Sequence, residues 1–393
     1  MASDKDPFEG AERPGEESNP LAEFMAQFGI RPGADGNYDL GELMGHLQAA
    51  MGQMGAQMAA FGGGDDGLNW SFVRDVARKV TASQGADPST TPAETAAVRD
   101  AVGLADLWLD RQTSFGRVSA PAAAWSRAEW VEHTLPVWQQ LVSPVAASLA
   151  AAISSMIGRQ SAELAGLQPM MEPMMRAASS GMLAAQIGQA LGLLSTDVVS
   201  ACDISIPLTA KPVIALLPGN AAKFGAGLAQ SDADVRLYLA LRETARQRLF
   251  AAVGWLGPQL LALLEHYARG IAIDASAIEE ALESQLSGDV SPAALESLGQ
   301  TLAGKLFEPV RTPEQDAILQ RLETLVALVE GWVDDVVSCT TAGLMPGAGA
   351  LLESVRRRRA TGGPTETALK QLLNLELRPR RVRDAANLWA ALR

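Results

Sequence analysis

Three residues in one stretch of the chain have the types and the spacing to do chemistry. Arg242, Glu243 and Arg246 form the pattern Arg-Glu-x-x-Arg within the segment 231–250. Residues four apart lie one turn above each other on a helix, so both guanidinium groups can point toward one place. The carboxylate between them could act as a general base or as the anion of a buried ion pair. Histidines at the two outer positions would form a zinc motif, but arginine has no lone pair to offer a metal.

A second pair of acidic residues has the same spacing. Glu330 and Asp334 are four apart in the segment 328–335. Arginine and glutamate one turn apart are common on solvated helix faces, where each pair contributes only about 0.3 to 0.5 kcal/mol. Spacing alone therefore favours ordinary surface pairs.

A resemblance to a known family reverses that preference. The segment 231–250 resembles the active-site helix of the zincin-like family, zinc-dependent metalloproteases and predicted hydrolases that are common in high-GC Gram-positive bacteria. In that family the helix carries His-Glu-x-x-His, in which the histidines bind zinc and the glutamate activates a zinc-bound water. The resemblance covers most of the chain beyond residue 67, with further similar strings at 105–110, 129–138 and 377–385.

The resemblance implies a role for each of these five residues. Glu243 matches the general base, Glu330 the glutamate that is the third metal ligand, and Asp334 the residue that orients a ligand histidine. Arg242 and Arg246 stand where the family has its two histidines. We therefore expect no zinc and no other cofactor. We also expect both guanidinium groups to occupy the metal position and to pair with the three carboxylates, so that the fold is retained and peptidase activity is lost.

The remaining sequence favours a mainly α fold, a multi-helix zincin-like body with one short β-hairpin before the motif helix. Hydrophobic residues make up 48% of the chain and aromatic residues only 5%, a mixture that favours helices. The hairpin is predicted at 201–208 and 213–217, around a turn. Gly188 and Gly192, four apart, indicate a close approach of two helices. Helices are predicted at 70–83, 91–112, 128–142, 145–167, 175–194, 232–253, 257–271, 275–286, 292–306, 313–342, 347–359, 365–375 and 381–392.

Composition divides the chain into two regions. Residues 1–66 are acidic and rich in Gly and Met, which predicts a flexible arm with one possible docking helix at 40–61. Residues 67–393 are predicted to form the helical zincin-like domain.

Charge and composition also argue against several classes of function. A net charge of -13 opposes a general nucleic-acid surface, so we expect the arginines at 356–359 and 378–383 in ion pairs or on solvated faces. The longest apolar runs, 143–158 and 181–194, are too short to span a membrane. Two cysteines and a charged beginning favour a cytoplasmic protein without a signal peptide.

We expect a protein- or peptide-binding scaffold that uses the former substrate cleft, with the strand at 213–217 as an edge for an extended peptide. The alternative is an active zinc hydrolase with other ligands. Its candidates are His133 and His266, neither of which has a second ligand at suitable spacing. A third possibility is an interaction protein that binds through the Met-rich helix and the arginine-rich C-terminal segment. The sequence leaves the oligomeric state open.

Overall fold

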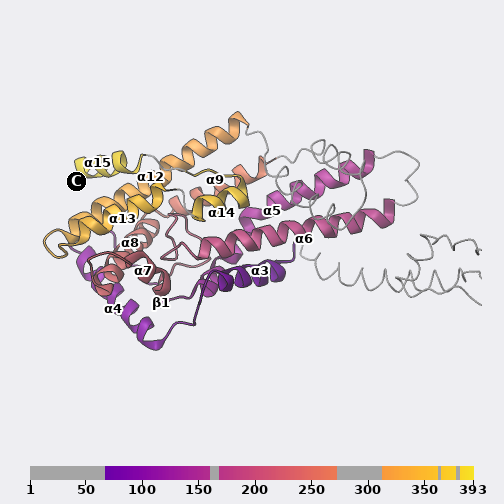
Figure 1. The fold of residues 1–393 in the computed structure, drawn as a ribbon. Coiled ribbons are helices and arrows are strands. Elements are labelled where there is room, and N and C mark those ends of the chain that lie inside the picture. The colour runs from indigo at the N-terminus through magenta and orange to yellow at the C-terminus, as the bar shows by residue number, and fades with distance from the viewer. Residues whose placement is uncertain (1–66, 160–167, 272–311, 362–363, 378–380) are drawn as a thin grey trace, which may run out of the picture. The chain divides into compact units, whose positions relative to one another are not determined.

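A computed structural model describes residues 67–159, 168–271, 312–361, 364–377 and 381–393, and in these ranges the mainly α prediction is confirmed (Figure 1). The arm at 1–66 and the helices predicted at 275–286 and 292–306 lie outside the described residues. The elements are α3 (Trp70–Ser83), α4 (Pro92–Leu109), β1 (Ala122–Ala124), α5 (Arg127–Arg159), α6 (Gln168–Ser195), β2 (Ile214–Leu216), α7 (Pro218–Gly225), α8 (Asp232–Ala252), α9 (Leu256–Arg269), α12 (Pro313–Thr341), α13 (Ala348–Ala360), α14 (Pro364–Leu373) and α15 (Val382–Leu392).

Side-chain caps fix where the main helices begin. Thr91 accepts a hydrogen bond from the backbone of Glu94, whose carboxylate accepts from the Thr91 backbone, so α4 starts with a complete capping box. Thr312 and Gln315 do the same for α12. Ser231 caps α8, the motif helix, by accepting from the N–H of Asp234. These caps satisfy N–H groups that have no partner inside their own helix.

The predicted break between two helices at 143–144 is wrong, because α5 continues through it. Two helices were predicted at 128–142 and 145–167, with a break between them. The structure has one helix from Arg127 to Arg159 that contains Pro136 and Pro144. Proline removes one backbone hydrogen bond, but the burial of Leu141, Val142 and Val145 around that position holds the helix continuous.

The predicted β-hairpin is wrong. β2 pairs in parallel with β1, so that Ile214, Ala215 and Leu216 lie opposite Ala122, Ala123 and Ala124. Most of the segment 201–208 forms turns, and only Ser200 makes an isolated antiparallel bridge, to Leu216. A run of three alanines has little strand propensity. The pairing of β1 with β2 therefore depends on tertiary packing, which no local sequence pattern predicts.

Glycines bring α3 and α6 together as predicted. A Cβ atom added at Gly188 would lie 2.6 Å from the carbonyl oxygen of Val73, and one at Gly192 would lie 2.7 Å from that of Ala77. Both distances are too short for any other residue type. The two glycines therefore let the helix backbones touch, and this contact helps to close the core around α6.

The motif helix α8 runs through the interior. Every residue from Leu237 to Leu249 is buried, although this stretch includes five charged or amide side chains. Around α8 pack α4, α7, α12 and β2, and α12 in turn contacts α9 and α15. A helix buried on all sides is usually apolar, so its polar side chains must find partners inside the protein.

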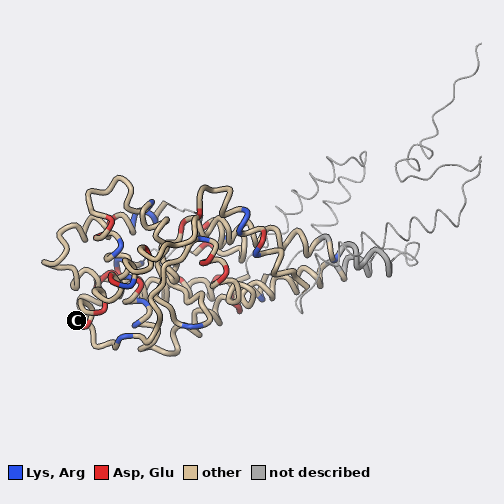
Figure 2. The backbone as a smooth tube through the Cα atoms, turned by 90° about the horizontal axis from the view of Figure 1, so that it is seen from below, with Lys and Arg blue, Asp and Glu red and all other residues tan. Residues whose placement is uncertain are grey.

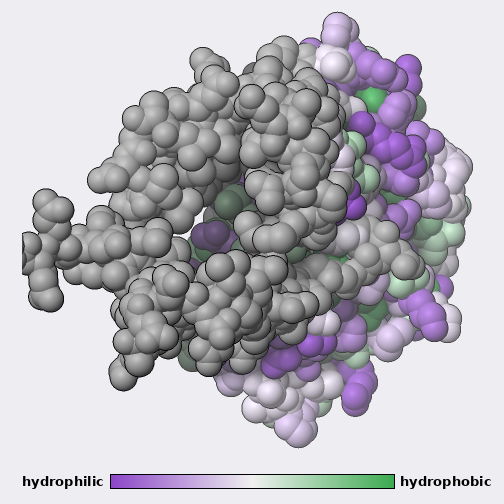
Figure 3. Space-filling model, turned by 90° about the vertical axis from the view of Figure 1, so that its right-hand side faces the viewer, coloured by the Kyte–Doolittle hydropathy of each residue, from purple (hydrophilic) through white to green (hydrophobic). Residues whose placement is uncertain are grey.

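Basic and acidic residues are interspersed along the described ranges (Figure 2), and on the face in Figure 3 hydrophilic and hydrophobic residues mix. Among the described residues, the exposed large hydrophobic ones are Leu104, Leu107, Trp255, Leu344, Leu388 and Leu392. No single helix among the described ones is long and apolar enough to cross a membrane. Only α8 and α9 taken together have the length and composition, and they are bent by 92° at their junction.

Candidate functional site

Both arginines of the motif are inside the protein. Arg242 is 2% exposed and Arg246 is 1% exposed. They are therefore not the solvated surface pairs that spacing alone favoured. A buried guanidinium without an anionic partner would cost several kcal/mol, so each needs a partner inside the protein. Their partners come from α12, which lies against α8.

The structure brings Arg242 and Arg246 together with Glu330 and Asp334. Nη2 of Arg242 donates to Oε2 of Glu330 at 2.6 Å, and its Nη1 donates to Oδ1 of Asp334 at 2.7 Å. Nε of Arg246 donates to Oε1 of Glu330 at 2.7 Å. The acidic residues are as deeply buried as the arginines, at 1% for Glu330 and 2% for Asp334. The two helices are therefore joined by three charge-assisted hydrogen bonds.

Glu330 is the centre of this cluster. Besides both motif arginines, it accepts hydrogen bonds from the hydroxyl of Ser205 and from Nη1 of Arg359. Burial alone would raise the pKa of Glu330, but the guanidinium groups of Arg246, Arg359 and Arg242 hold it well below the ordinary value. A carboxylate has about four acceptor positions, and here four donors use them. Glu330 is thus ionised and fully engaged.

Glu243 has a different environment. It accepts from the hydroxyl of Ser200 at 2.7 Å, from Nε2 of Gln247 at 3.0 Å and from the backbone N–H of Cys202 at 3.3 Å. Nη1 of Arg246 lies 3.5 Å away, at the limit of a hydrogen bond. Burial raises the pKa of Glu243 and outweighs the opposing effect of Arg246 and of these donors. The carboxylate is held by neutral donors and is fully buried, so water does not reach it as it reaches the base of a working hydrolase.

Three further arginines, all from α13, complete the cluster, and sequence reasoning did not assign them to it. Arg356 donates to Asp334 at 3.1 Å, and Arg359 donates to Glu330. Arg358 donates to Oδ2 of Asp203 at 2.6 Å. Asp203 was predicted to lie in the strand 201–208, but it lies in a turn. The available signal was a run of arginines in an acidic chain, for which internal ion pairs had been expected.

The donor set does not fit zinc. A zinc ion takes neutral imidazole nitrogen, thiolate sulfur or carboxylate oxygen, whereas the two ligand positions on α8 hold permanently protonated arginines. Within the described residues, no group of three or more His, Cys, Asp or Glu side chains is arranged to hold a metal. His133 stacks on Trp125 with ring centres 4.3 Å apart. His266, which is 54% exposed, lies 3.2 Å from Glu314.

A small pocket opens beside the cluster. Its volume is about 100 Å³, and its lining includes Glu330, Ser205 and the side chains of Arg358 and Arg359. Ser205 has a φ of 63°, in the left-handed region that a serine seldom adopts. Its hydroxyl donates to Glu330, which helps to hold this conformation, and a carboxylate whose pKa is held so low is a poor base. Ser205 is thus a structural donor rather than an activated nucleophile.

The strand proposed as a peptide-binding edge is not free. On one side, β2 bonds to the β1 segment through Ile214 and Leu216. On its other side, Ala201 donates to the carbonyl of Ala215 at 3.0 Å, and Leu217 donates to that of Val199 at 3.0 Å. All residues of β2 are buried. An extended peptide could therefore not add to this strand without displacing part of the protein.

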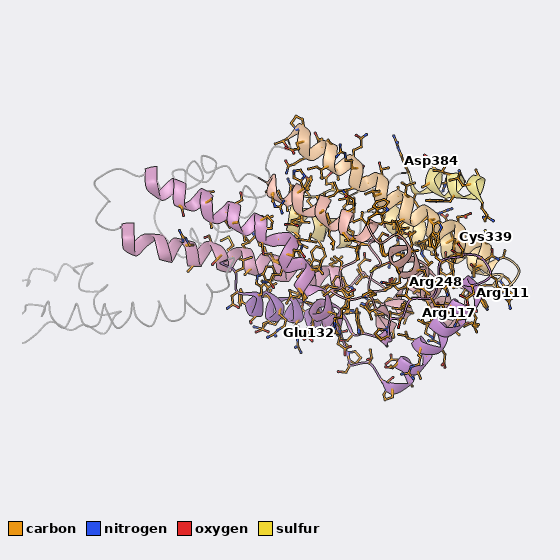
Figure 4. The ribbon with its side chains drawn as sticks, turned by 180° about the vertical axis from the view of Figure 1, so that it is seen from behind. Arg111, Arg117, Glu132, Arg248, Cys339 and Asp384 are labelled. Atoms are coloured by element: carbon orange, nitrogen blue, oxygen red, sulfur yellow. The ribbon has the colours of Figure 1, made fainter. Side chains whose placement is uncertain are left out.

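A second group of ion pairs fixes α8 on its other side. Arg248, 1% exposed, donates to Asp106 at 2.5 Å and to Asp110 at 2.8 Å, both near the end of α4. Arg117 also binds Asp110, and the two arginines lie close together beside α4 in Figure 4. Asp106 and Asp110 belong to the family-like string at 105–110. That string therefore positions the motif helix.

Comparison with known proteins gives this arrangement its context. A family model described as zincin-like metallopeptidase matches residues 68–393. No curated protein shows significant similarity to the chain. Among solved structures, the chain is similar to one from Chloroflexus aurantiacus that is described as a candidate hydrolase with a novel fold. The identity is 20%, the TM-score is 0.54, and the match covers 83% of this chain and 88% of that chain, which shows a shared fold. Because the family model matches most of the chain, the chain belongs to the zincin-like metallopeptidase family.

Proposed function

We propose that this chain is a zincin-like family member that binds no zinc and has no peptidase activity, and that it serves as a protein- or peptide-binding scaffold. The observation that carries the proposal is that Arg242 and Arg246 both form buried ion pairs with the carboxylate of Glu330. In the family, Glu330 matches a metal ligand, yet here its acceptor positions are used by donors of the protein itself.

Electrostatics supports the loss of zinc. A divalent cation near Glu330 would meet the charges of Arg242, Arg246 and Arg359, none of which can be deprotonated near neutral pH. Without the metal, a water beside Glu243 has no means of reaching a useful pKa, because zinc lowers the pKa of its bound water to about 7. Hydrolysis of a peptide bond by this helix is therefore not expected.

The scaffold role is supported by two features. The family acts on peptides by description, and a partly open pocket borders the former metal position. The intact ion-pair cluster preserves the walls of that region, so binding could persist after catalysis is lost. A cytoplasmic location remains the one that we expect from the cysteine content.

Metal analysis of the full chain tests the loss of zinc. The protein is purified without chelator, and its zinc content is measured by mass spectrometry together with cleavage of a mixed peptide pool. We expect zinc well below one ion per chain and no cleavage that a chelator suppresses. Stoichiometric zinc with chelator-sensitive cleavage would support the alternative of an active hydrolase with other ligands.

Selection from a random peptide library tests the scaffold role. The library presents free peptides with both ends accessible, and the full chain is the bait. We expect an enriched set of related sequences that bind without being cut. Failure to enrich any sequence over a bait-free control would contradict a peptide-binding role.

A further inference from the structure

A pocket without charged lining residues opens where α12 ends and α13 begins. Its wall is formed by Tyr238 of α8, by the last turn of α12 and by the segment that leads into α13. These three helices pack against one another and lie side by side in Figure 1. All ten residues that line the pocket are uncharged, and none of them lines the pocket beside Glu330.

Small residues keep this pocket open. Gly343 has a φ of 76°, which favours glycine, and no neighbouring group lies within 4 Å of a Cβ added at Gly349. The buried side chains of Tyr238, Thr341 and Met345 form the inner wall. The volume of the pocket is about 320 Å³, about twice that of a cavity of about 150 Å³ that holds one benzene ring. The pocket therefore has room for two fused rings.

Two helix ends of opposite polarity meet at the pocket. The C-terminal end of α12 carries partial negative charge, and the N-terminal end of α13 carries partial positive charge. No side chain caps α13 at Gly347, and the N–H of Gly349, in the first turn, has no acceptor within its own helix. Because the two ends oppose each other, they favour neither a cation nor an anion. A neutral group with both an acceptor and a donor suits them.

Two hydroxyl groups supply the same combination from the side chains. Burial raises the pKa of Tyr238, so its hydroxyl stays protonated at neutral pH and can donate. The hydroxyl of Thr341 already donates to the carbonyl of Val337 at 2.8 Å, so its oxygen can only accept a further hydrogen bond. A donor from α8 and an acceptor from α12 therefore border the same space.

We propose that this pocket binds an uncharged bicyclic compound that contains a cyclic amide, with its carbonyl toward Tyr238 and Gly349 and its N–H toward Thr341. The rings would contact the hydrocarbon of Met345 and Leu352, as in small-molecule sites that combine apolar walls with a few polar groups. The inference goes beyond the scaffold role and does not depend on it, since this pocket shares no lining residue with the one beside Glu330.

Three compounds of similar size test the proposal. Carbostyril is a benzene ring fused to a cyclic amide, N-methylcarbostyril lacks the amide N–H, and quinaldate is an anion. Each is titrated to about 10 mM against the full chain by ligand-observed NMR, because compounds this small bind in the millimolar range or more tightly. We expect saturable binding of carbostyril. N-methylcarbostyril should bind up to about tenfold more weakly, for one lost hydrogen bond, and quinaldate at least about tenfold more weakly, because no lining residue pairs with its charge.

Variants locate the site. Gly349→Leu places a side chain in the open space of the pocket and should abolish binding of carbostyril. Ala350→Leu is the control, because Ala350 is the next residue of α13, is exposed and does not line the pocket. Thr341→Val removes the acceptor oxygen. It should weaken carbostyril to the affinity of N-methylcarbostyril and leave the affinity of N-methylcarbostyril unchanged. Melting curves verify that each variant is folded.

Several results would overturn the assignment. They are the lack of saturable carbostyril binding, tighter binding of quinaldate than of carbostyril, and an unchanged carbostyril affinity in folded Gly349→Leu. An equal loss of both carbostyrils in Thr341→Val would also contradict it, because the N-methyl compound has no hydrogen bond to lose at that oxygen. Loss of binding in Gly349→Leu but not in Ala350→Leu, with the selective effect of Thr341→Val, would support the pocket and the orientation of the amide within it.

Discussion

Arg246 of α8 donates from Nε to Oε1 of Glu330 on α12 at 2.7 Å, and both groups are almost fully buried. The sequence resemblance matches these two positions to zinc ligands on two different helices. An ion pair thus joins the elements that a metal would join. We infer that this ion pair keeps a cross-link between α8 and α12 in place of a metal.

Removing the shared carboxylate should destabilise the fold. Glu330→Ala leaves Arg242, Arg246 and Arg359 without their common anion, and breaking a buried pair in this way costs about 3 to 5 kcal/mol. The free energy of unfolding is measured with urea. The control Glu353→Ala removes an exposed carboxylate 4.0 Å from Arg357 and should change stability by less than about 0.5 kcal/mol. Equal small effects for both variants would mean that the cluster does not hold the helices together.

Neutral amides should have different effects at the two glutamates. At neutral pH, Glu330→Gln should be strongly destabilising because three arginines depend on that charge. Glu243→Gln should change stability by no more than about 1 kcal/mol, because burial already disfavours the charge there and neutral donors surround it. Urea unfolding at one pH compares the two. A larger loss for Glu243→Gln would reverse the assignment of Glu330 as the central anion.

The pKa of Glu330 also sets a pH dependence. A carboxyl whose folded pKa is lowered contributes stability above its unfolded pKa, and this stability is lost as the pH falls through the folded value. The stability difference between the natural chain and Glu330→Gln should therefore be full at neutral pH and narrow as the pH drops below the ordinary 4.5. Glu243 acts with the opposite sign, because its folded pKa is raised. If the stability difference between the two proteins stayed constant from pH 7 to acidic pH, Glu330 would not have the lowered pKa that its arginine partners imply.

Local patterns and long-range contacts were not equally predictable. The caps at Thr91, Ser231 and Thr312 and the glycine pair on α6 follow from short-range rules, and the structure has them. The convergence of Arg242 with Glu330 needed the family resemblance, because spacing alone favoured surface pairs. The bond between Arg358 and Asp203 joins residues 155 apart. No periodicity signals such a contact, and the prediction of a strand at 201–208 placed Asp203 in the wrong kind of element.

The contact of α3 with α6 gives a test that is independent of the ion pairs. Gly188→Ala would place a methyl group 2.6 Å from the carbonyl oxygen of Val73, so the helices must separate, and overpacking of this kind costs about 1 to 3 kcal/mol. Gly103→Ala on α4 is the control, because nothing lies within 4 Å of its added Cβ and alanine is the better helix former by about 1 kcal/mol. Thermal unfolding should show opposite shifts. Parallel shifts would mean that the two backbones are not in contact.

Restoring two histidines tests whether the fold still holds the geometry of a metal site. The double variant Arg242→His with Arg246→His recreates His-Glu-x-x-His on α8, with Glu330 opposite as a third ligand. We expect it to take up zinc, measured by mass spectrometry and by a zinc-dependent rise in melting temperature. Affinity should increase further with Arg359→Gln, since Arg359 also occupies Glu330. Arg242→Gln with Arg246→Gln removes the same charges without supplying imidazoles and should bind none. If the histidine variant folds but binds no zinc, the backbone positions of α8 and α12 differ from those of a zinc site, and not only their side chains.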